Sequence, residues 1–597
     1  MRKTISKITA GLIVSSMLVG TSSVAYARDA DIPQAKLHWN QTHQVIDGFG
    51  ASQSCDVYAD QIYEFDKRDE VMDLLFSGEK GIGLSILRSE VGNGLNMPTI
   101  HPDPETWDFT AYEPEQWVLH EAKKRGVEKI MSTVWSPPAW MKTTNRIVRG
   151  GHLKKECYQD YAEYLVNYVK GYKEHHGVEI NAVSIANEPE YAAPWQSCLW
   201  SPEEFSDFLA NYLKPVFEKE HLDTDIIVGE EGTWTDKRLS AVYEKPEALE
   251  AMDIVGGHYY HGQPHEFTKA KEHNKRVWET EVSDTLHSTT DFKDGVKWSR
   301  YVHDFMTKSD ANAFLYWLGA SYKTNNESLI RLQENGSYIA AKRLYSLGNF
   351  SKYVRPGYVR MDIDENPYGN LHLSAYKNPE TGEFAIVAVN DGQNNETFDL
   401  NFDGITCGEL TPHITNERYN LETFKPIGAE NGKFRLSVSG YTTITYTGTA
   451  NSREPEKRVW RLEDELADWS KIYSRSDDWI IERNNPYNAF DHDLTRARRT
   501  SKSLQNIVYR LDSMTDFEAV IYYHMALEGL SFETSTDGEH WTALDYRYDP
   551  PTLTGGFWER IVVKPEKKLE EGTQFLRINF DGGGKAWDKH LTKIHIN

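Results

Sequence analysis

The chain has 597 residues, of which 39% are hydrophobic, and its formal net charge is −24. Single hydrophobic cores stop growing beyond roughly 300 residues, so this length predicts several domains. Acidic residues outnumber basic residues by 90 to 66, and such a surface repels phosphate backbones, which excludes nucleic acid as an expected partner. The charge suits a protein that acts on a neutral polymer.

The N-terminus has the three parts of a secretory signal. Basic residues at the start precede an apolar stretch over 10–20, and the sequence AYA at 25–27 supplies a cleavage pattern. We therefore expect residues 1–27 to be a signal peptide and the mature protein to be a secreted monomer. No later stretch is apolar for long enough to cross a bilayer, so we expect no membrane association after cleavage. A single retained membrane anchor is the alternative.

Short strand-like runs alternate with helix-like segments from about residue 45 to 320. The helix-like apolar spacing is clearest over 158–175 and 202–220. Eight strands that alternate with helices indicate parallel units closed into a (β/α)8 TIM barrel, which we place at 45–348. The predicted strands are 45–51, 83–88, 129–135, 182–187, 225–229, 254–260, 276–281 and 313–317.

Beyond the predicted barrel the helical segments disappear. Strand patterns with intervening turn signals predict a β-sandwich side domain from 349–450, to which 28–44 adds a strand. A polar linker over 449–457 then leads to a third region, 455–597, with the pattern of a jelly-roll-like β-sandwich. The fold class is therefore multidomain, with a TIM barrel, an associated side domain and a C-terminal sandwich.

The four cysteines do not form a recognisable pattern. They are too few and too scattered for a disulfide framework or a zinc site, so one disulfide and free buried thiols both stay open. The sequence shows no convincing metal-ligand cluster, and we expect no metal and no cofactor. The cysteines are Cys55, Cys157, Cys198 and Cys407.

Two carboxylates end strands that the barrel prediction places on opposite walls. Glu188 follows the apolar run 182–186, and Glu281 ends the run 276–281. They are 93 residues apart, about three barrel units of roughly 31 residues each. Paired carboxyls in one cleft carry out glycosidic bond hydrolysis, with Glu188 suited to the acid role and Glu281 to the nucleophile role. Glu279 competes with Glu281, because residues two apart on a strand face the same way.

Four sequence blocks, in order, resemble glycoside hydrolase family 30. They are VIDGFGA at 45–51, WSPPAWMK at 135–142, ANEP at 186–189 and WETE at 278–281, and the resemblance runs from about 37 to 450. The resemblance implies a retaining, double-displacement mechanism with Glu188 as acid/base and Glu281 as nucleophile. It also places substrate-binding residues around the reacting sugar, with a hydrogen bond from Tyr260 to Glu281. These residues are Arg88, Trp135, Tyr260 and Trp317.

Other residues near these blocks have weaker claims to a role. Asn187 could bind the sugar 2-hydroxyl, whereas His258 reads as a structural histidine. Glu230 and Glu231 read as acids of the barrel rim or as substrate contacts. Arg88 could instead neutralise a buried acid, and the tryptophans could be ordinary core residues. Trp195 and Trp200 lie in a loop that could line the cleft.

The resemblance implies a polysaccharide or oligosaccharide substrate, most consistent with β-1,4-xylan. β-1,6-Galactan, β-1,6-glucan and an exo-acting β-glycosidase are the alternatives, and a non-catalytic glycan-binding protein is the alternative from another class. Glucuronoxylan-specific members carry an arginine after the last barrel strand, but here 316–323 has none, and Lys323 or Arg331 would be poor substitutes. In the C-terminal sandwich, exposed aromatics could bind glycan. The candidates are Trp541, Trp558 and Trp587.

Overall fold

The structure of the protein is a computed structural model. It describes residues 32–452, 458–483, 493, 495–524, 527–548, 551–553, 558–581 and 585–597. The predicted signal peptide and residues 453–457 of the predicted linker lie outside the described residues. Within the described ranges, no helix is both long and apolar enough to cross a membrane.

The central unit is a closed parallel barrel, as the sequence predicts. All eight predicted strands are present, and the pairing of the last strand with the first and with its predecessor closes the ring. Two short strands, β10 (Ser328–Leu332) and β11 (Tyr338–Ala340), extend the sheet beyond β9. The barrel strands are β2 (Gly48–Ser54), β3 (Ile86–Glu90), β4 (Lys129–Thr133), β5 (Ala182–Ser184), β6 (Asp225–Thr233), β7 (Ile254–His261), β8 (Arg276–Val282) and β9 (Ala313–Ser321).

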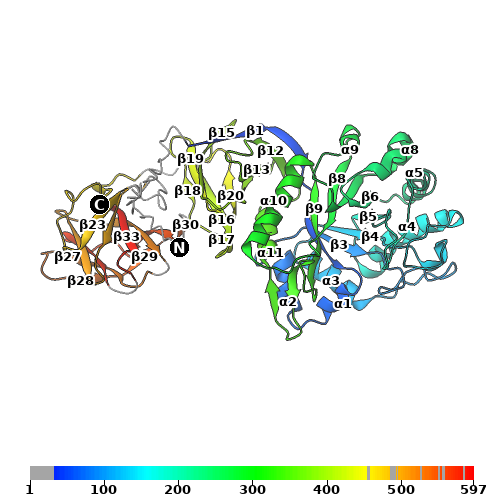
Figure 1. Cartoon of the computed structure of the whole chain (residues 1–597), viewed down its shortest axis with the longest axis horizontal. Coiled ribbons are helices and arrows are strands. Elements are labelled where there is room, and N and C mark those ends of the chain that lie inside the picture. The colour runs from blue at the N-terminus through cyan, green and yellow to red at the C-terminus, as the bar shows by residue number, and fades with distance from the viewer. Residues whose placement is uncertain are drawn as a thin grey trace, which may run out of the picture. The chain divides into compact units, whose positions relative to one another are not determined.

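Helices surround the barrel strands (Figure 1). The predicted helical segments are present as α4, which ends where Gly177 takes a φ of 67°, and as α5, which begins at a capping box between Ser201 and Glu204. The helices are α1 (Tyr58–Tyr63), α2 (Arg68–Phe76), α3 (Glu113–Lys124), α4 (Tyr158–His176), α5 (Pro202–Phe208), α6 (Lys214–Lys219), α7 (Ser240–Glu244), α8 (Pro246–Ala251), α9 (Thr268–Glu272), α10 (Phe292–Lys308) and α11 (Lys342–Ser351).

An apolar layer closes the interior of the barrel. Seven of the eight strands contribute to it, and every member is almost completely buried. Because residues two apart on a strand share a face, the polar side chains that follow these positions point into the same interior one step closer to the C-terminal ends. The layer consists of Ile86, Met131, Ala182, Ile227, Ile254, Trp278, Ala313 and Leu315.

The side domain is a ten-stranded sheet that curls around its own core. Strand β19, at one end of the strand order, contacts β14 and β20 from its middle. The segment before the barrel, β1, lies within this sheet, antiparallel to β12 and parallel to β15, as the sequence predicts. The strands are β1 (Gln34–Val45), β12 (Val359–Ile363), β13 (Leu371–Lys377), β14 (Glu383–Asn390), β15 (Glu396–Asp403), β16 (Glu409–Thr415), β17 (Asn420–Thr423), β18 (Ile427–Gly428), β19 (Lys433–Val438) and β20 (Thr442–Thr449).

The boundary between the side domain and the barrel differs from the prediction. Val45, predicted to start the barrel, ends β1, and the barrel begins at Gly48. Gly48 has a φ of 142°, and a Cβ atom there would lie 2.2 Å from the Ser85 hydroxyl oxygen. Only glycine allows both this backbone angle and this close approach, so the chain passes from one sheet to the other at this residue.

The C-terminal unit consists of two antiparallel sheets around one apolar core, in agreement with the predicted sandwich. One sheet has the order β23-β24-β33-β26-β31-β29, and the other has the order β22-β25-β32-β27-β28. The strands are β21 (Leu462–Asp464), β22 (Ser474–Arg475), β23 (Trp479–Arg483), β24 (Thr495–Arg499), β25 (Gln505–Arg510), β26 (Phe517–His524), β27 (Leu530–Ser535), β28 (Thr542–Leu544), β29 (Tyr546–Tyr548), β30 (Thr552–Leu553), β31 (Trp558–Pro565), β32 (Phe575–Phe580) and β33 (Lys589–Ile596).

The three aromatic candidates of this sandwich differ in exposure. Trp587 is 37% exposed, and the Lys585 ammonium lies 4.9 Å from its ring. Trp558 is buried against His590, which overturns the expectation that it is exposed. Trp541 is half-buried, with the Arg577 guanidinium 4.0 Å from its ring.

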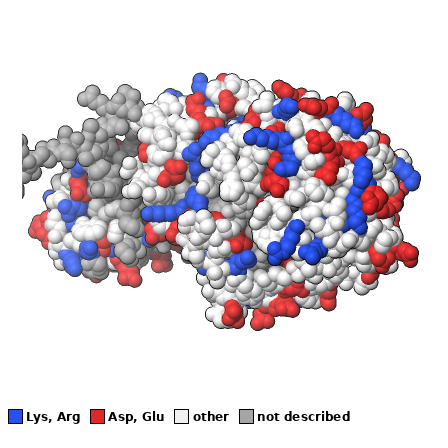
Figure 2. Space-filling model, turned by 45° about the vertical axis from the view of Figure 1, so that its right-hand side comes forward, with Lys and Arg blue, Asp and Glu red and all other residues white. Residues whose placement is uncertain are grey.

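The four cysteines are all buried and free, so the structure favours free thiols over a disulfide. On the face shown in Figure 2, acidic and basic side chains are interspersed over the described surface. The excess of acidic residues is therefore not gathered into one patch on this face.

A buried ion pair joins α10 to α11. Arg343 is 1% exposed, and its guanidinium donates to Asp294 Oδ2 at 2.6 Å and to the carbonyl oxygens of Thr289 and Ser328. Breaking a buried pair leaves an uncompensated charge in the interior, which costs much more than losing an exposed pair.

We expect Arg343→Met to lower the free energy of unfolding by roughly 3–5 kcal/mol, because Asp294 would stay buried without its partner. Urea unfolding followed by tryptophan fluorescence measures the change. Lys173→Met, which removes an exposed ion pair with Glu179, is the matched control and should change the value by at most about 1 kcal/mol. Equal effects of the two variants would contradict a stabilising role for the buried pair.

Candidate active site

A cavity of about 1100 Å³ lies at the C-terminal ends of the barrel strands. Parallel barrels place their functional side chains at this end, because the loops that follow all eight strands meet there. Six of the seven site residues predicted from the sequence line the cavity, and Arg88 lies buried beside them. The six are Trp135, Asn187, Glu188, Tyr260, Glu281 and Trp317.

Glu188 follows β5 in a strained backbone conformation. Its φ is +44°, a left-handed value that non-glycine residues rarely adopt. Glu230, within the neighbouring strand β6, also has a positive φ of 51°, and its carbonyl oxygen accepts a hydrogen bond from the Glu188 amide. Backbone strain of this kind persists only where surrounding contacts enforce it, and it gathers at functional sites.

Glu281, on β8, faces the cavity with both carboxylate oxygens hydrogen-bonded. Tyr260 donates to Oε1 at 2.9 Å, which is the bond that the resemblance implies, and Arg88 donates to Oε2 at 2.6 Å. Burial and the neighbouring Glu281 charge raise the pKa of Tyr260 well above its usual value, so the phenol remains a donor.

Arg88 binds several groups at once from the interior of the barrel. Its side chain is fully buried, and besides Glu281 it donates to Asn187 Oδ1 at 2.7 Å, to Glu230 Oε1 at 3.2 Å and to Thr133 Oγ1 at 3.2 Å. Because arginine only donates, this contact orients the Asn187 amide with its oxygen toward Arg88. The amide NH₂ group of Asn187 is therefore left for the cavity.

The sequence suggested that Glu230 is an acid of the barrel rim, but the structure places it in the interior. Its side chain is fully buried, lies outside the cavity lining and accepts hydrogen bonds from Arg88 and Ser184. Burial opposes ionisation, but Arg88 and His258 outweigh it and lower the pKa of Glu230 to about 2. Glu231 is also buried and pairs with Arg238.

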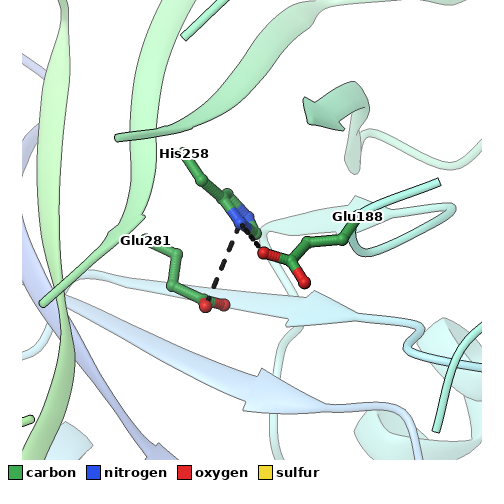
Figure 3. A group of neighbouring side chains, drawn as sticks. All are labelled: Glu188, His258 and Glu281. Atoms are coloured by element: carbon green, nitrogen blue, oxygen red, sulfur yellow. Dashed lines mark ion pairs between the residues drawn. The ribbon is translucent and has the colours of Figure 1, made fainter. Parts of the chain in front are cut away.

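His258, on β7, lies among three carboxylates and is more than a structural histidine. Its ring nitrogens lie 3.5 Å from Glu188 and 3.9 Å from Glu281 (Figure 3). They also lie 3.6 Å from Glu230. These separations indicate charge interaction rather than well-formed hydrogen bonds. Burial disfavours the imidazolium, but the three carboxylates reverse that effect and raise the pKa of His258 to about 10.

One oxygen from each of Glu188 and Glu281 and one nitrogen of His258 all lie within 4.8 Å of one another. By distance alone, these three side chains could hold a metal ion. The donor set does not fit one, because a metal ligand histidine must be deprotonated and Arg88 already places a cation beside Glu281. The arrangement instead places the carboxyl groups of Glu188 and Glu281 close enough to act on the same bond of a substrate.

Glu279 does not share the orientation of Glu281. The pairing of β8 shifts register with β7 after Gly257 and with β9 after Glu279, so the regular alternation of faces is broken here. Glu279 is fully buried, accepts hydrogen bonds from the Glu281 and Leu315 amides, and does not line the cavity.

Aromatic side chains form two parts of the cavity wall. Trp135 and Trp317 lie together near Arg88, whose guanidinium is 4.5 Å from the Trp135 ring. Tyr191 and Trp195 follow Glu188, line the rim and are each 48% exposed. Trp200 instead lies in the hydrophobic core, so only the first part of this predicted loop lines the cleft.

The sequence and the structure are similar to those of known glycosidases. The family model described as glycosyl hydrolase family 59 matches residues 46–336. A glucuronoxylanase of Bacillus subtilis (strain 168) is 27% identical over 382 residues, which cover 62% of this chain and 82% of that enzyme. The galactocerebrosidase of Mus musculus is 25% identical over 55% of this chain and 44% of its own length.

Solved structures agree with the sequence comparisons. The catalytic domain of a family 30 xylanase from Talaromyces cellulolyticus superimposes with a TM-score of 0.64 at 27% identity, covering 70% of this chain and all of that chain. A family 30 subfamily 8 xylanase from Clostridium acetobutylicum gives a TM-score of 0.60 at 27% identity with the same coverage.

The charge network predicts a pH-dependent contribution of His258 to stability. Its pKa is raised from 6.5 to about 10 by folding, so the contribution is fully present below pH 6.5 and is lost as the pH rises toward 10. We expect His258→Gln to destabilise the protein most near pH 6, and the difference from the wild type to shrink by about 1 kcal/mol per pH unit above pH 7.

Urea unfolding at intervals between pH 6 and 9 measures this difference. His221→Gln, which changes a surface histidine on the loop after α6, serves as the control and should show no such trend. A destabilisation by His258→Gln that stays constant with pH would mean that His258 is neutral in the folded protein.

Proposed function

We propose that the chain is a member of glycoside hydrolase family 30 and a retaining β-glycosidase that hydrolyses β-1,4-xylan. In this proposal Glu281 is the nucleophile and Glu188 is the acid/base. The observation that carries it is the proximity of the two carboxyl groups, with oxygens within 4.8 Å of each other. Retaining enzymes hold their carboxyl groups about 5–5.5 Å apart, whereas inverting enzymes leave room for a water molecule.

The reaction proceeds in two displacements. Glu281 attacks the anomeric carbon while Glu188 gives its proton to the departing glycosidic oxygen, which yields a glycosyl ester on Glu281 and a free hydroxyl on the leaving sugar. Glu188 then takes a proton from water, which attacks the same carbon and releases Glu281. Two inversions at one carbon return the β-anomer.

The surrounding residues support this division of roles. Tyr260 and Arg88 each direct a donor at one oxygen of Glu281, which fixes the carboxylate for attack. The Asn187 amide, oriented by Arg88, is placed to donate to the sugar 2-hydroxyl, a contact that strengthens in the transition state. His258 adds a buried positive charge between Glu188 and Glu281.

The cavity favours a neutral sugar chain over one that carries uronic acid. Its two lysines are already paired, Lys297 with Asp284 and Lys323 with Glu327. Arg331 does not line the cavity. We therefore propose that unsubstituted stretches of xylan are the substrate, although one similar enzyme is named a glucuronoxylanase. The acidic lining residues are Asp56, Glu90, Glu188, Glu190, Glu281, Asp284 and Glu327.

We also propose that the protein is secreted and that its C-terminal sandwich binds glycan. The signal pattern in residues 1–27 supports secretion. Trp587 supports glycan binding, since an exposed indole ring can stack on the apolar face of a sugar.

We expect Glu281→Gln to lower kcat/KM on linear xylan by at least about 10³-fold, because the amide cannot form the covalent ester. Reducing-sugar release measures activity, and Glu272→Gln on the exposed surface of α9 should match the wild type. NMR of the first product formed by the wild type should show the β-anomer. Undiminished activity of Glu281→Gln would eliminate the proposed nucleophile, and an initial α-anomer would eliminate retention.

The rim aromatics predict a binding site for the leaving sugars, since they follow the acid Glu188 in the chain. We expect Trp195→Ala to lower kcat/KM on xylan by about tenfold, because an exposed indole face that stacks on a sugar is worth about 1–2 kcal/mol. Hydrolysis of a xylobiosyl fluoride, which has no leaving sugar, should change less than about twofold. Trp107→Ala, at an exposed tryptophan outside the cavity, is the control. Equal losses on both substrates would contradict this position.

A further inference from the structure

Glu90 is a buried carboxyl group in the cavity wall that the proposed mechanism does not use. It is the last residue of β3, is 1% exposed and lines the cavity. It follows Arg88 by two residues, so both side chains face the barrel interior, with Glu90 about 7 Å closer to the mouth. Arg88 holds Glu281 from within the barrel, and Glu90 and Glu281 line the same cavity.

The three protein groups that contact the Glu90 carboxyl group are all donors from loops at the mouth. The Asp56 amide donates to Oε2 at 2.9 Å, and the Asn93 and Gln196 side-chain amides donate to Oε1 at 2.8 and 3.2 Å. Burial is the largest influence on this group and raises the pKa of Glu90 to about 8, despite these donors. Below that pH the carboxyl group carries a proton, and the three hydrogen bonds given above use the group only as an acceptor.

A buried O–H group needs an acceptor, and a substrate in the cavity that Glu90 lines can bring one. A sugar hydroxyl oxygen meets this need. The internal unit of a β-1,4-linked xylan has only its 2- and 3-hydroxyls free, since O1 and O4 are in linkages. The Asn187 amide beside Glu188 accounts for the 2-hydroxyl.

We propose that Glu90 is a specificity-determining residue that donates a hydrogen bond to the 3-hydroxyl of the sugar attacked by Glu281. This inference rests on the proposed function and deepens it.

The test uses 2,4-dinitrophenyl β-xylobioside and its analogue that lacks the 3-hydroxyl on the reacting sugar. The dinitrophenolate leaves without a proton from Glu188, so kcat/KM reports binding and attack alone. We expect Glu90→Ala to lower kcat/KM on the full substrate by about 10- to 100-fold. On the 3-deoxy analogue the same variant should lose less than about threefold, because the partner of Glu90 is already absent.

A role confined to holding the three loops would give equal losses on both substrates, and that result would overturn the proposal. The two proposals stay separate, because Glu281→Gln should lose activity on both substrates, whereas Glu90→Ala should keep most of its activity on the 3-deoxy analogue. If Glu90→Ala does not fold, Glu90→Gln provides the second measurement through its pH profile. The wild-type kcat/KM on the full substrate should fall as the pH rises through about 8, when Glu90 loses its proton.

Glu90→Gln, which cannot lose a proton, should lack this fall, and so should the wild type on the 3-deoxy analogue. The charged or titratable groups facing Glu90 are Asp56 and Cys55 after β2, Arg88 on β3, Glu115 on α3 and Tyr164 on α4. Burial also raises the pKa of Glu115 to about 8. Glu115→Gln is therefore the matched control, and its kcat/KM should still fall as the pH rises through about 8. If the kcat/KM of Glu115→Gln did not fall, Glu90 would be rejected as the titrating donor.

Discussion

The active-site end of the barrel depends on one buried cation. The Arg88 guanidinium has no access to water, and a charge in that position is tolerated only when nearby groups neutralise and hydrogen-bond it. Glu281, Glu230 and Asn187 meet that requirement from three other strands or their ends. Because each of these groups would be costly to bury without the others, the position of Glu281, the proposed nucleophile, is set by the same contacts that keep the barrel interior stable.

Departures from regular strand geometry place the reactive groups. Glu188, after β5, and Glu230, within β6, adopt left-handed backbone conformations, and the register shift in β8 turns Glu281, but not Glu279, toward the cavity. The apolar layer below contains none of these departures and supplies the rigid base that holds them. The packing of the apolar layer therefore stabilises the strained backbone conformations at the mouth of the barrel.

The sequence was sufficient to predict the barrel, because eight apolar strand-like runs that alternate with helical segments are compatible with few other folds. It was also sufficient to bring Glu188 and Glu281 into one cavity, since both end strands three units apart. It misplaced Glu230 and undervalued His258, because polar residues usually mark the surface. Nothing local in the sequence shows that Glu230 pairs with Arg88 or that His258 lies among three carboxylates. The spacing of Glu90 from Arg88 was a signal for a cavity position, but its three donors come from distant loops.

Strand β1 ties the two ends of the catalytic region together. It lies between β12 and β15, so residue 37 pairs with residues 363 and 402. During synthesis, this segment emerges more than 300 residues before either neighbour and must wait, unpaired, while the whole barrel is made. A truncation that starts at the barrel would remove a strand from the middle of the neighbouring sheet. The barrel and the side domain must therefore be kept together when the protein is shortened or recombined.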